Sequence, residues 1–280
     1  MYSRTMLKVR TLSNNLKMYG STSSNFVNVS VNDKSGVAIV TMQREPVNSL
    51  NLELITQLKT ALSDLERNKC RGMILTSASK SVFSAGLDIM EMYKPNQERV
   101  RNFWLSLQDL WMTLYGCSYP SVAAINGHSP AGGCLLSMSC EYRIMLPNFT
   151  IGLNETKLGI IAPSWFVATM KNTIGFRKAE MALTLGFLFT TEEALKVGLI
   201  DEVASSKEDA IAKADKFIGQ FAKIPPQPRT ISKLMLRSKD IETLRKTKEQ
   251  DLQAFLQVVN DPKTQKGLEL YLESLKQRKA

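Results

Sequence analysis

The chain of 280 residues contains one histidine and four cysteines. His128 alone cannot build a His-rich metal site, and it leaves room for only one Ser-His or Cys-His catalytic pair. No two cysteines have the CxxC spacing that is typical of zinc and redox sites, so we expect reduced thiols in the core. The sequence therefore predicts no metal site.

Long apolar runs are also missing. No stretch reaches the roughly 18 apolar residues that a membrane-spanning helix requires, so we expect no membrane span. Apolar residues still make up 44% of the chain, which is enough to fill the core of one large domain or of a domain with an appendage.

Acidic residues are absent from the first 25 residues, which carry four basic and several hydroxyl side chains. Apolar side chains in this segment recur at spacings of three and four, as on one face of a helix: Val9, Leu12, Leu16 and Tyr19. A secretory signal would need a continuous apolar segment, whereas this composition is typical of a mitochondrial presequence. We therefore expect residues 1–25 to be a removable presequence and the protein to lie in the mitochondrial matrix, the alternative being a basic tail.

The net charge of +10 raises the question of nucleic-acid binding, because clustered lysine and arginine release counterions from phosphates. Four of these charges lie in residues 1–25, so +6 remains without them. That surplus suits the anionic nucleotide part of a small ligand equally well. There is no RNP-like motif of aromatic and basic residues, and RNA binding stays open only as the alternative to an enzyme.

Short β-rich runs alternate with amphipathic helical segments from residue 26 onward, which predicts an α/β domain. Residues 36–42, 72–76 and 121–125 are the expected strands. Asn51 is a plausible helix cap, because a helical stripe follows it: Leu54, Ile55, Leu58, Leu62 and Leu65.

The character of the chain changes after about residue 207. Lysine and glutamate alternate with leucine, and a proline-rich break at 225–228 separates two helical stretches. We therefore predict three parts: residues 1–25 as presequence, 26–207 as the α/β core, and 208–280 as a helical region.

Two turns of small residues, 83–89 and 130–133, could leave backbone N–H groups pointing into a cavity. Two such donors can form an oxyanion hole. Neither turn matches the phosphate-binding P-loop or the GxGxxG pattern, and no GxSxG nucleophile motif is present. The small residues of each turn, taken alone, are most simply explained by the requirements of a tight turn.

Three segments, 84–89, 124–134 and 151–159, occur in the order and spacing of the crotonase (enoyl-CoA hydratase/isomerase) superfamily. The resemblance covers about residues 35 to 280, and the chain is most similar to the mitochondrial enoyl-CoA isomerases of that superfamily. It implies an α/β fold of ββα units wound into a spiral, with a C-terminal helical region that forms homotrimers. It also implies an acyl-CoA thioester substrate from β-oxidation of unsaturated fatty acids, and no cofactor besides the substrate's own coenzyme A.

The resemblance also assigns roles to residues. The backbone N–H groups of Leu87 and Gly132 would hold the thioester oxygen, and Glu155 would be the catalytic carboxylate. The residues expected along the coenzyme A are Ala85, Gly86, Asp88 and Ile89. We expect the Asp88 carboxylate to stabilise its own turn as well.

The hydratases of the superfamily use two glutamates, and this chain has Leu135 where the first would stand. Adding water requires one group for the water and another for the α-proton, so a single carboxylate favours a proton shuttle. An apolar pocket would raise the pKa of Glu155. The expected wall residues are Ile160, Ile161, Trp165 and Phe166.

Two further alternatives concern the same fold. A dienoyl-CoA isomerase resembles the chain but uses additional acids in the pocket, and neither Leu135 nor the segment 159–165 offers one. An inactive scaffold is the other alternative, and the retention of Glu155 and of both turns argues against it.

Overall fold

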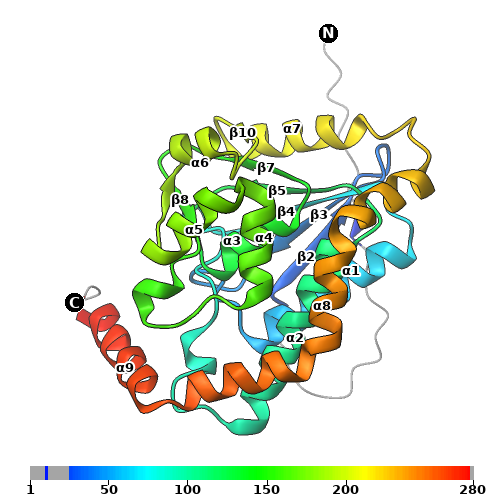
Figure 1. The fold of residues 1–280 in the computed structure, drawn as a ribbon. Coiled ribbons are helices and arrows are strands. Elements are labelled where there is room, and N and C mark those ends of the chain that lie inside the picture. The colour runs from blue at the N-terminus through cyan, green and yellow to red at the C-terminus, as the bar shows by residue number, and fades with distance from the viewer. Residues whose placement is uncertain (1–9, 12–24, 278–280) are drawn as a thin grey trace.

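The computed structural model describes residues 10–11 and 25–277, and a seven-stranded sheet forms its centre (Figure 1). The strand order is β1-β2-β3-β4-β5-β7-β10. The pairs β1–β2 and β2–β3 are antiparallel, and the other neighbours are parallel. The strands are β1 (Arg10–Thr11), β2 (Val27–Val31), β3 (Val37–Met42), β4 (Gly72–Ser77), β5 (Ser121–Ile125), β7 (Tyr142–Met145) and β10 (Glu202–Val203). The three strands expected from the sequence are thus confirmed as β3, β4 and β5.

The central strands β4 and β5 are buried on both faces, so their sequences are short and mostly apolar. Successive residues of β5 point to opposite faces: Ala123 joins the main core, whereas Val122 and Ala124 join a second, smaller cluster. The main core is covered by α1 (Leu52–Arg67) and α2 (Gln97–Gly116). The smaller cluster is covered by α7 (Lys207–Gly219), which supplies Ala210, Ala214 and Ile218.

Two sequence features place these helices. Asn51 caps α1, because its side chain accepts a hydrogen bond from the N–H of Leu54 at 3.0 Å. Gly72 in β4 lets α7 pack closely, because a Cβ at this position would lie 2.4 Å from Cγ2 of Ile218. α7 begins at the boundary expected between the core and the helical region, and it packs on the sheet.

A second sheet consists of three short strands in the order β6-β8-β9. Its strands are β6 (Ser129–Pro130), β8 (Thr150–Gly152) and β9 (Phe189–Thr190). The remaining elements of the core are the 3-10 helices η1 (Ile89–Glu91) and η2 (Glu155–Leu158), with α3 (Gly132–Ser139), α4 (Ser164–Ile174), α5 (Phe176–Leu185) and α6 (Thr191–Val197). The short strands β6 and β8 therefore lead directly into α3 and η2.

The C-terminal part is a long helix, α8 (Pro226–Asn260), followed by α9 (Pro262–Gln277). In Figure 1, α8 runs along one side of the molecule and α9 lies near its lower edge. A helical C-terminal region is thus confirmed. The predicted presequence lies almost entirely outside the described residues, and only Arg10 and Thr11 of β1 and the last residue, Asn25, are described.

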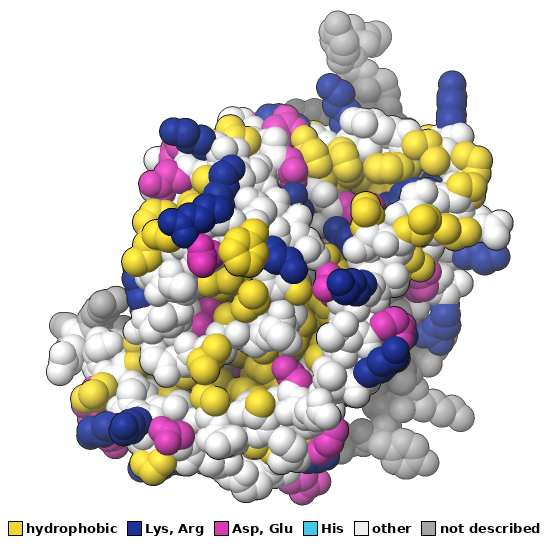
Figure 2. All heavy atoms as spheres, viewed as in Figure 1, with side chains coloured by type: hydrophobic (Ala, Val, Ile, Leu, Met, Phe, Trp, Pro, Cys, Tyr) yellow, Lys and Arg dark blue, Asp and Glu magenta, His cyan; other side chains and the backbone are white. Residues whose placement is uncertain are grey.

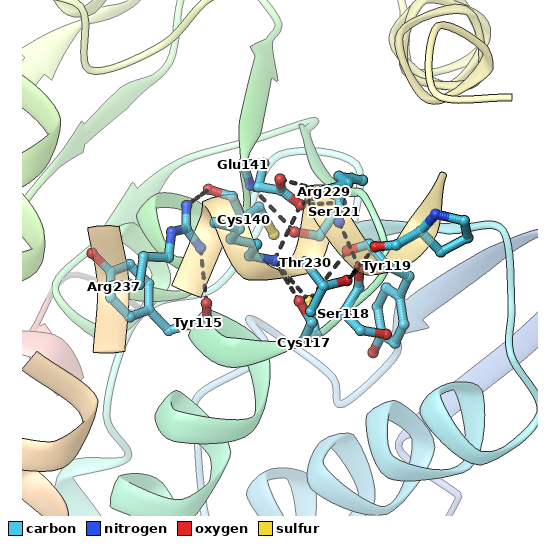
Figure 3. Close-up of polar contacts among 12 residues, drawn as sticks. Tyr115, Cys117, Ser118, Tyr119, Ser121, Cys140, Glu141, Arg229, Thr230 and Arg237 are labelled. Carbon is cyan, nitrogen blue, oxygen red and sulfur yellow. Dashed lines mark hydrogen bonds and ion pairs between the residues drawn. The ribbon is translucent and has the colours of Figure 1, made fainter. Parts of the chain in front are cut away.

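Basic side chains on one face of α8 attach it to the core (Figure 3). Arg229 pairs with Glu141 at 2.5 Å, and the buried Lys233 donates to the Cys117 carbonyl at 2.7 Å. One turn further along, Arg237 donates to the carbonyls of Tyr115 and Ser139, at the ends of α2 and α3. Cations at helix C-termini interact favourably with the helix dipole, so these contacts fix α8 against both helices.

Candidate active site

Glu155 is the first residue of η2 and is only 4% exposed. Neither of its carboxylate oxygens has a hydrogen-bond partner among the residues that the structure describes. Burial raises the pKa of Glu155 from 4.5 to about 7. The side chain is therefore a proton acceptor and donor of near-neutral pKa that no neighbour holds in place.

The chain around Glu155 is shaped by its neighbours in sequence. η2 ends at Gly159, which adopts the left-handed conformation with φ of 73°. Asn154 precedes the helix, but its side chain makes no capping hydrogen bond, and its buried Oδ1 has no partner among the described residues. Asn154 therefore neither caps η2 through its side chain nor hydrogen-bonds the carboxylate.

The backbone N–H groups of Leu87 and Gly132 lie next to each other. In a parallel bridge with Leu50, the Gly86 carbonyl accepts a hydrogen bond at 2.8 Å and the Asp88 N–H donates one at 3.0 Å. The N–H of the intervening Leu87 consequently points the other way, toward α3. A Cβ built on Gly132 would lie 3.4 Å from the Leu87 nitrogen, so the two segments are in van der Waals contact.

Small residues make this close approach possible. Gly86 has φ of 86°, and a Cβ there would lie 2.9 Å from the Cβ of Ala131 and 3.2 Å from the Gly132 nitrogen. Ala131 itself has φ of 50°, a strained value for a residue with a side chain, and it turns the chain from β6 into α3. Gly132 is the first residue of α3, so its N–H has no acceptor within the helix and lies at the positive end of the helix dipole.

The stretch expected along coenzyme A, residues 85–89, contains Leu87, which forms the parallel bridge with Leu50. The N–H of Ala85 donates to the Val47 carbonyl at 2.9 Å, and the Ala85 side chain is exposed. Asp88 accepts a hydrogen bond from the N–H of Met90 at 3.0 Å, which confirms that it stabilises its own turn. Its other oxygen pairs with Arg44 at 2.8 Å.

A cavity of about 520 Å³ brings Leu87 and Glu155 together. The face drawn in Figure 2 is hollowed near its centre, in the region of α4 and α8, and yellow hydrophobic side chains gather there. Apolar residues from several elements line the cavity: Met92, Ile160, Ile161, Ala162, Phe166, Phe255, Val258, Val259 and Leu268. Three of the four expected wall residues are thus confirmed.

The fourth, Trp165, does not line the cavity, so that expectation was wrong. Its ring is buried behind the wall, in edge contact with Trp104 at 5.9 Å and Phe166 at 4.5 Å. The reason is helical geometry: Trp165 and Phe166 are neighbours in α4, and they point in directions about 100° apart. Trp104 of α2 lines the cavity in its place.

One acidic residue of the cavity, Asp251 of α8, was not expected from the sequence. It lies far in sequence from the motifs, whereas Leu135 and the segment 159–165 near them supply no acid. Leu135 is a buried core residue in α3. No local pattern marks Asp251, because its partner Trp104 is 147 residues away in sequence.

Other kinds of site find no support in the described part of the chain. Residues 25–277 contain no group of three or more His, Cys, Asp or Glu that could hold a metal ion. No described helix is both long enough and apolar enough to cross a bilayer. His128 is exposed, and its Nδ1 accepts a hydrogen bond from the N–H of Thr150 at 3.1 Å.

The model of the enoyl-CoA hydratase/isomerase family matches residues 32–279. The chain belongs to this family. It is 47% identical over 249 residues to the mouse protein "Enoyl-CoA delta isomerase 1, mitochondrial", an alignment that covers 88% of this chain and 86% of that protein. The human protein of the same name is 44% identical over 248 residues, covering 88% of this chain and 82% of that protein. The family resemblance read from the three motifs is confirmed.

Solved structures of the family share the fold. The human mitochondrial delta3-delta2-enoyl-CoA isomerase superposes with a TM-score of 0.88 at 43% identity, over 91% of this chain and all of that one. An enoyl-CoA hydratase from Bacillus halodurans, at 24% identity and a TM-score of 0.79, shares the fold alone. The predicted crotonase fold is therefore confirmed.

Proposed function

We propose that the chain is an enoyl-CoA isomerase that converts 3-enoyl-CoA, cis or trans, into trans-2-enoyl-CoA in the β-oxidation of unsaturated fatty acids. The observation that carries the proposal is Glu155, a buried carboxylate that has no hydrogen-bond partner among the described residues and shares an apolar cavity with Leu87. The relatives named as enoyl-CoA delta isomerases support the same reaction.

In the proposed reaction, the thioester oxygen accepts hydrogen bonds from the N–H groups of Leu87 and Gly132. Glu155 removes a proton from C2, and the electron pair of that C–H bond passes into a dienolate whose negative charge rests on the thioester oxygen. The electron pair returns to C4, which takes the proton back from Glu155, and the double bond now joins C2 and C3. The donors stabilise the charge only where it develops, which is the basis of oxyanion catalysis.

The environment of Glu155 suits this shuttle. A carboxylate in water is a weak base, whereas a pKa of about 7 leaves roughly half of Glu155 ionised at neutral pH and makes the ionised form more strongly basic. Since no described residue hydrogen-bonds either oxygen, the carboxyl group can reach two carbons of one substrate without breaking a hydrogen bond to that part of the chain. Proton transfer of this kind needs no group beyond the substrate and the chain, so we propose no cofactor.

The substrate's coenzyme A would extend from the thioester along the stretch from Ala85 to Ile89. The Ala85 side chain is exposed, and Asp88 is held by its turn and by Arg44, so this stretch offers an ordered backbone edge. Its residues are proposed to contact the ligand through the main chain and through apolar surface: Ala85, Gly86, Asp88 and Ile89.

We also propose a homotrimer in the mitochondrial matrix. Large apolar side chains are exposed on α5 and α8, which is typical of subunit interfaces: Phe176, Leu185, Met235 and Leu236. Light scattering of the protein without residues 1–25 tests the trimer, because a monomeric mass would contradict it. The presequence is supported by its acid-free composition and by the mitochondrial relatives.

The function is tested with protein that lacks residues 1–25, incubated with 3-hexenoyl-CoA while the conjugated 2-enoyl thioester is followed by absorbance. Glu155→Gln and the hydration of crotonyl-CoA are measured in parallel. We expect fast isomerisation, little hydration, and a loss of about 10³-fold or more in kcat for the variant, since the shuttle has no second base. Full activity in the variant would exclude the proposed role of Glu155, and an inactive wild type would make RNA binding the next assay.

A further inference from the structure

Asp251 is a second carboxylate on the cavity wall, and neighbouring helices hold it firmly. Its Oδ2 accepts hydrogen bonds from Nε1 of Trp104 and Nε2 of Gln108, each at 2.7 Å. Nε1 of Trp165 donates to the same oxygen at 3.3 Å. Trp104 and Gln108 belong to α2 and Trp165 to α4, so three donors from two helices fix the direction of a side chain from α8.

The charge of Asp251 is not cancelled by a cation. All three donors are neutral, and within residues 25–277 no lysine or arginine forms an ion pair with this carboxylate. Lys248, one turn earlier in α8, pairs instead with Asp109 of α2. In a cavity with apolar walls, a charge acts on another charge more strongly than it does in water.

Asp251 lies some distance from the reacting end of the cavity. That end is near Leu268 of α9, because α9 packs against η2, which carries Glu155. The part of α8 next to α9 lines the cavity with apolar residues: Ala254, Phe255, Val258 and Val259. At a helical rise of 1.5 Å per residue, Asp251 lies about 12 Å along α8 from Val259.

The lining of α8 changes from apolar to polar at this position. The remaining cavity residues of α8, Thr243, Thr247 and Gln250, are all polar, and they lie beyond Asp251 as seen from α9. An acyl chain that starts at the thioester therefore passes apolar side chains first and reaches Asp251 with its far end.

We propose that Asp251 is a specificity-determining residue that rejects acyl chains with a negatively charged far end, so that the enzyme selects chains ending in a methyl group. The proposal rests on the isomerase function proposed above. Phe255 stacks on Trp104 with ring centroids 3.7 Å apart, and both residues line the cavity through which an alkyl chain would pass. A terminal carboxylate at the same place would meet the fixed charge of Asp251.

The test compares kcat/KM for 3-dodecenoyl-CoA with that for the same chain ending in a carboxylate, and with an uncharged chain ending in a hydroxyl. The variants are Asp251→Asn, which keeps an oxygen that can accept from the indoles, and Glu249→Gln as the control. Glu249 is also an acid of α8, but it lies outside this cavity, is mostly exposed and pairs with Arg101 at 2.9 Å.

The wild type should prefer the methyl-ended chain over the carboxylate-ended chain by at least about tenfold, which corresponds to about 1.4 kcal/mol. Asp251→Asn should remove most of this preference, while Glu249→Gln should keep it. The hydroxyl-ended chain should respond little to Asp251→Asn, because it carries no charge. The wild type should show no such preference between 3-hexenoyl-CoA and the chain of the same length that ends in a carboxylate, because these chains are too short to reach Asp251.

A preference that is absent in the wild type, or that persists in Asp251→Asn, would overturn the proposal. A preference lost equally in both variants would show an effect of surface charge instead. If Asp251→Asn does not fold, the comparison of long and short chains in the wild type decides, since equal discrimination at both lengths excludes Asp251. Failure of the wild type on every methyl-ended chain would instead overturn the isomerase function, and with it this proposal.

Discussion

Glu155→Gln should make the protein more stable at neutral pH, although we expect it to abolish catalysis. Glutamine keeps the shape of the side chain and removes its ionisation. Burial raises the pKa of Glu155 from 4.5 to about 7. At 1.36 kcal/mol per pKa unit, this difference corresponds to about 3 kcal/mol of folding free energy.

The direction of the effect depends on pH. Below pH 4.5 the carboxyl group is protonated in both the folded and the unfolded chain, so its ionisation does not affect stability. Between pH 4.5 and about 7 the unfolded chain loses this proton while the folded chain keeps it, and the stability of the wild type falls relative to the variant. Above about pH 7 both states are ionised, and the difference stays at about 3 kcal/mol.

Urea denaturation of both proteins at a series of pH values measures this difference. The gap between the two free energies of unfolding should open from pH 4.5 and reach its full size near pH 7. Glu98→Gln is the control, because Glu98 lies exposed at the start of α2 and its replacement should leave the pH dependence unchanged. Curves for wild type and Glu155→Gln that run parallel across this range would refute the reasoning.

The same carboxyl group should govern turnover: kcat/KM should rise about tenfold per pH unit until about pH 7 and then level off, because only ionised Glu155 accepts a proton. A profile that is flat below pH 7 would contradict this. Gly86→Ala should lower kcat about 10²-fold, because its Cβ would lie 3.2 Å from the Gly132 nitrogen and displace an oxyanion donor. Steady-state assays check it, and an unchanged kcat would remove Gly132 from its proposed role. Arg229→Ala should lower the free energy of unfolding by about 2 kcal/mol, because Nη2 of Arg229 donates to both carboxylate oxygens of Glu141 in a mostly buried pair, and only Lys233 would remain to pair with that carboxylate. Urea denaturation measures it, and a loss no larger than that caused by removing an exposed arginine would disprove it.

Local patterns in the sequence were sufficient for the three adjacent strands at the centre of the seven-stranded sheet, β3, β4 and β5, but not for the other four. β5 was expected at residues 121–125 and is found there, because a strand buried on both faces is a short apolar run with clear ends. The start of α1 was equally clear, since Asn51 is a capping residue before a helical stripe. The three motifs were located by their order and spacing, which resemble those of the crotonase superfamily, because each turn alone gives no sign of a functional role.

The far side of the cavity could not be predicted in this way. Trp104 and Asp251 meet only because α8 folds back across α2, and nothing near either residue in sequence indicates the contact. The misplacement of Trp165 has a similar origin. An apolar residue in α4 fits both the cavity wall and the core behind it, and only the packing of α2 and α8 decides between them.

The isolation of Glu155 also determines the fate of individual hydrogen atoms. Its oxygens have no hydrogen-bonded neighbour in the described part of the chain, and an acyl chain would fill the cavity in front of them. A deuterium atom removed from C2 would therefore have no route to solvent while the dienolate exists. It would reappear at C4 of the same molecule, so the product would retain the isotope that the substrate brought.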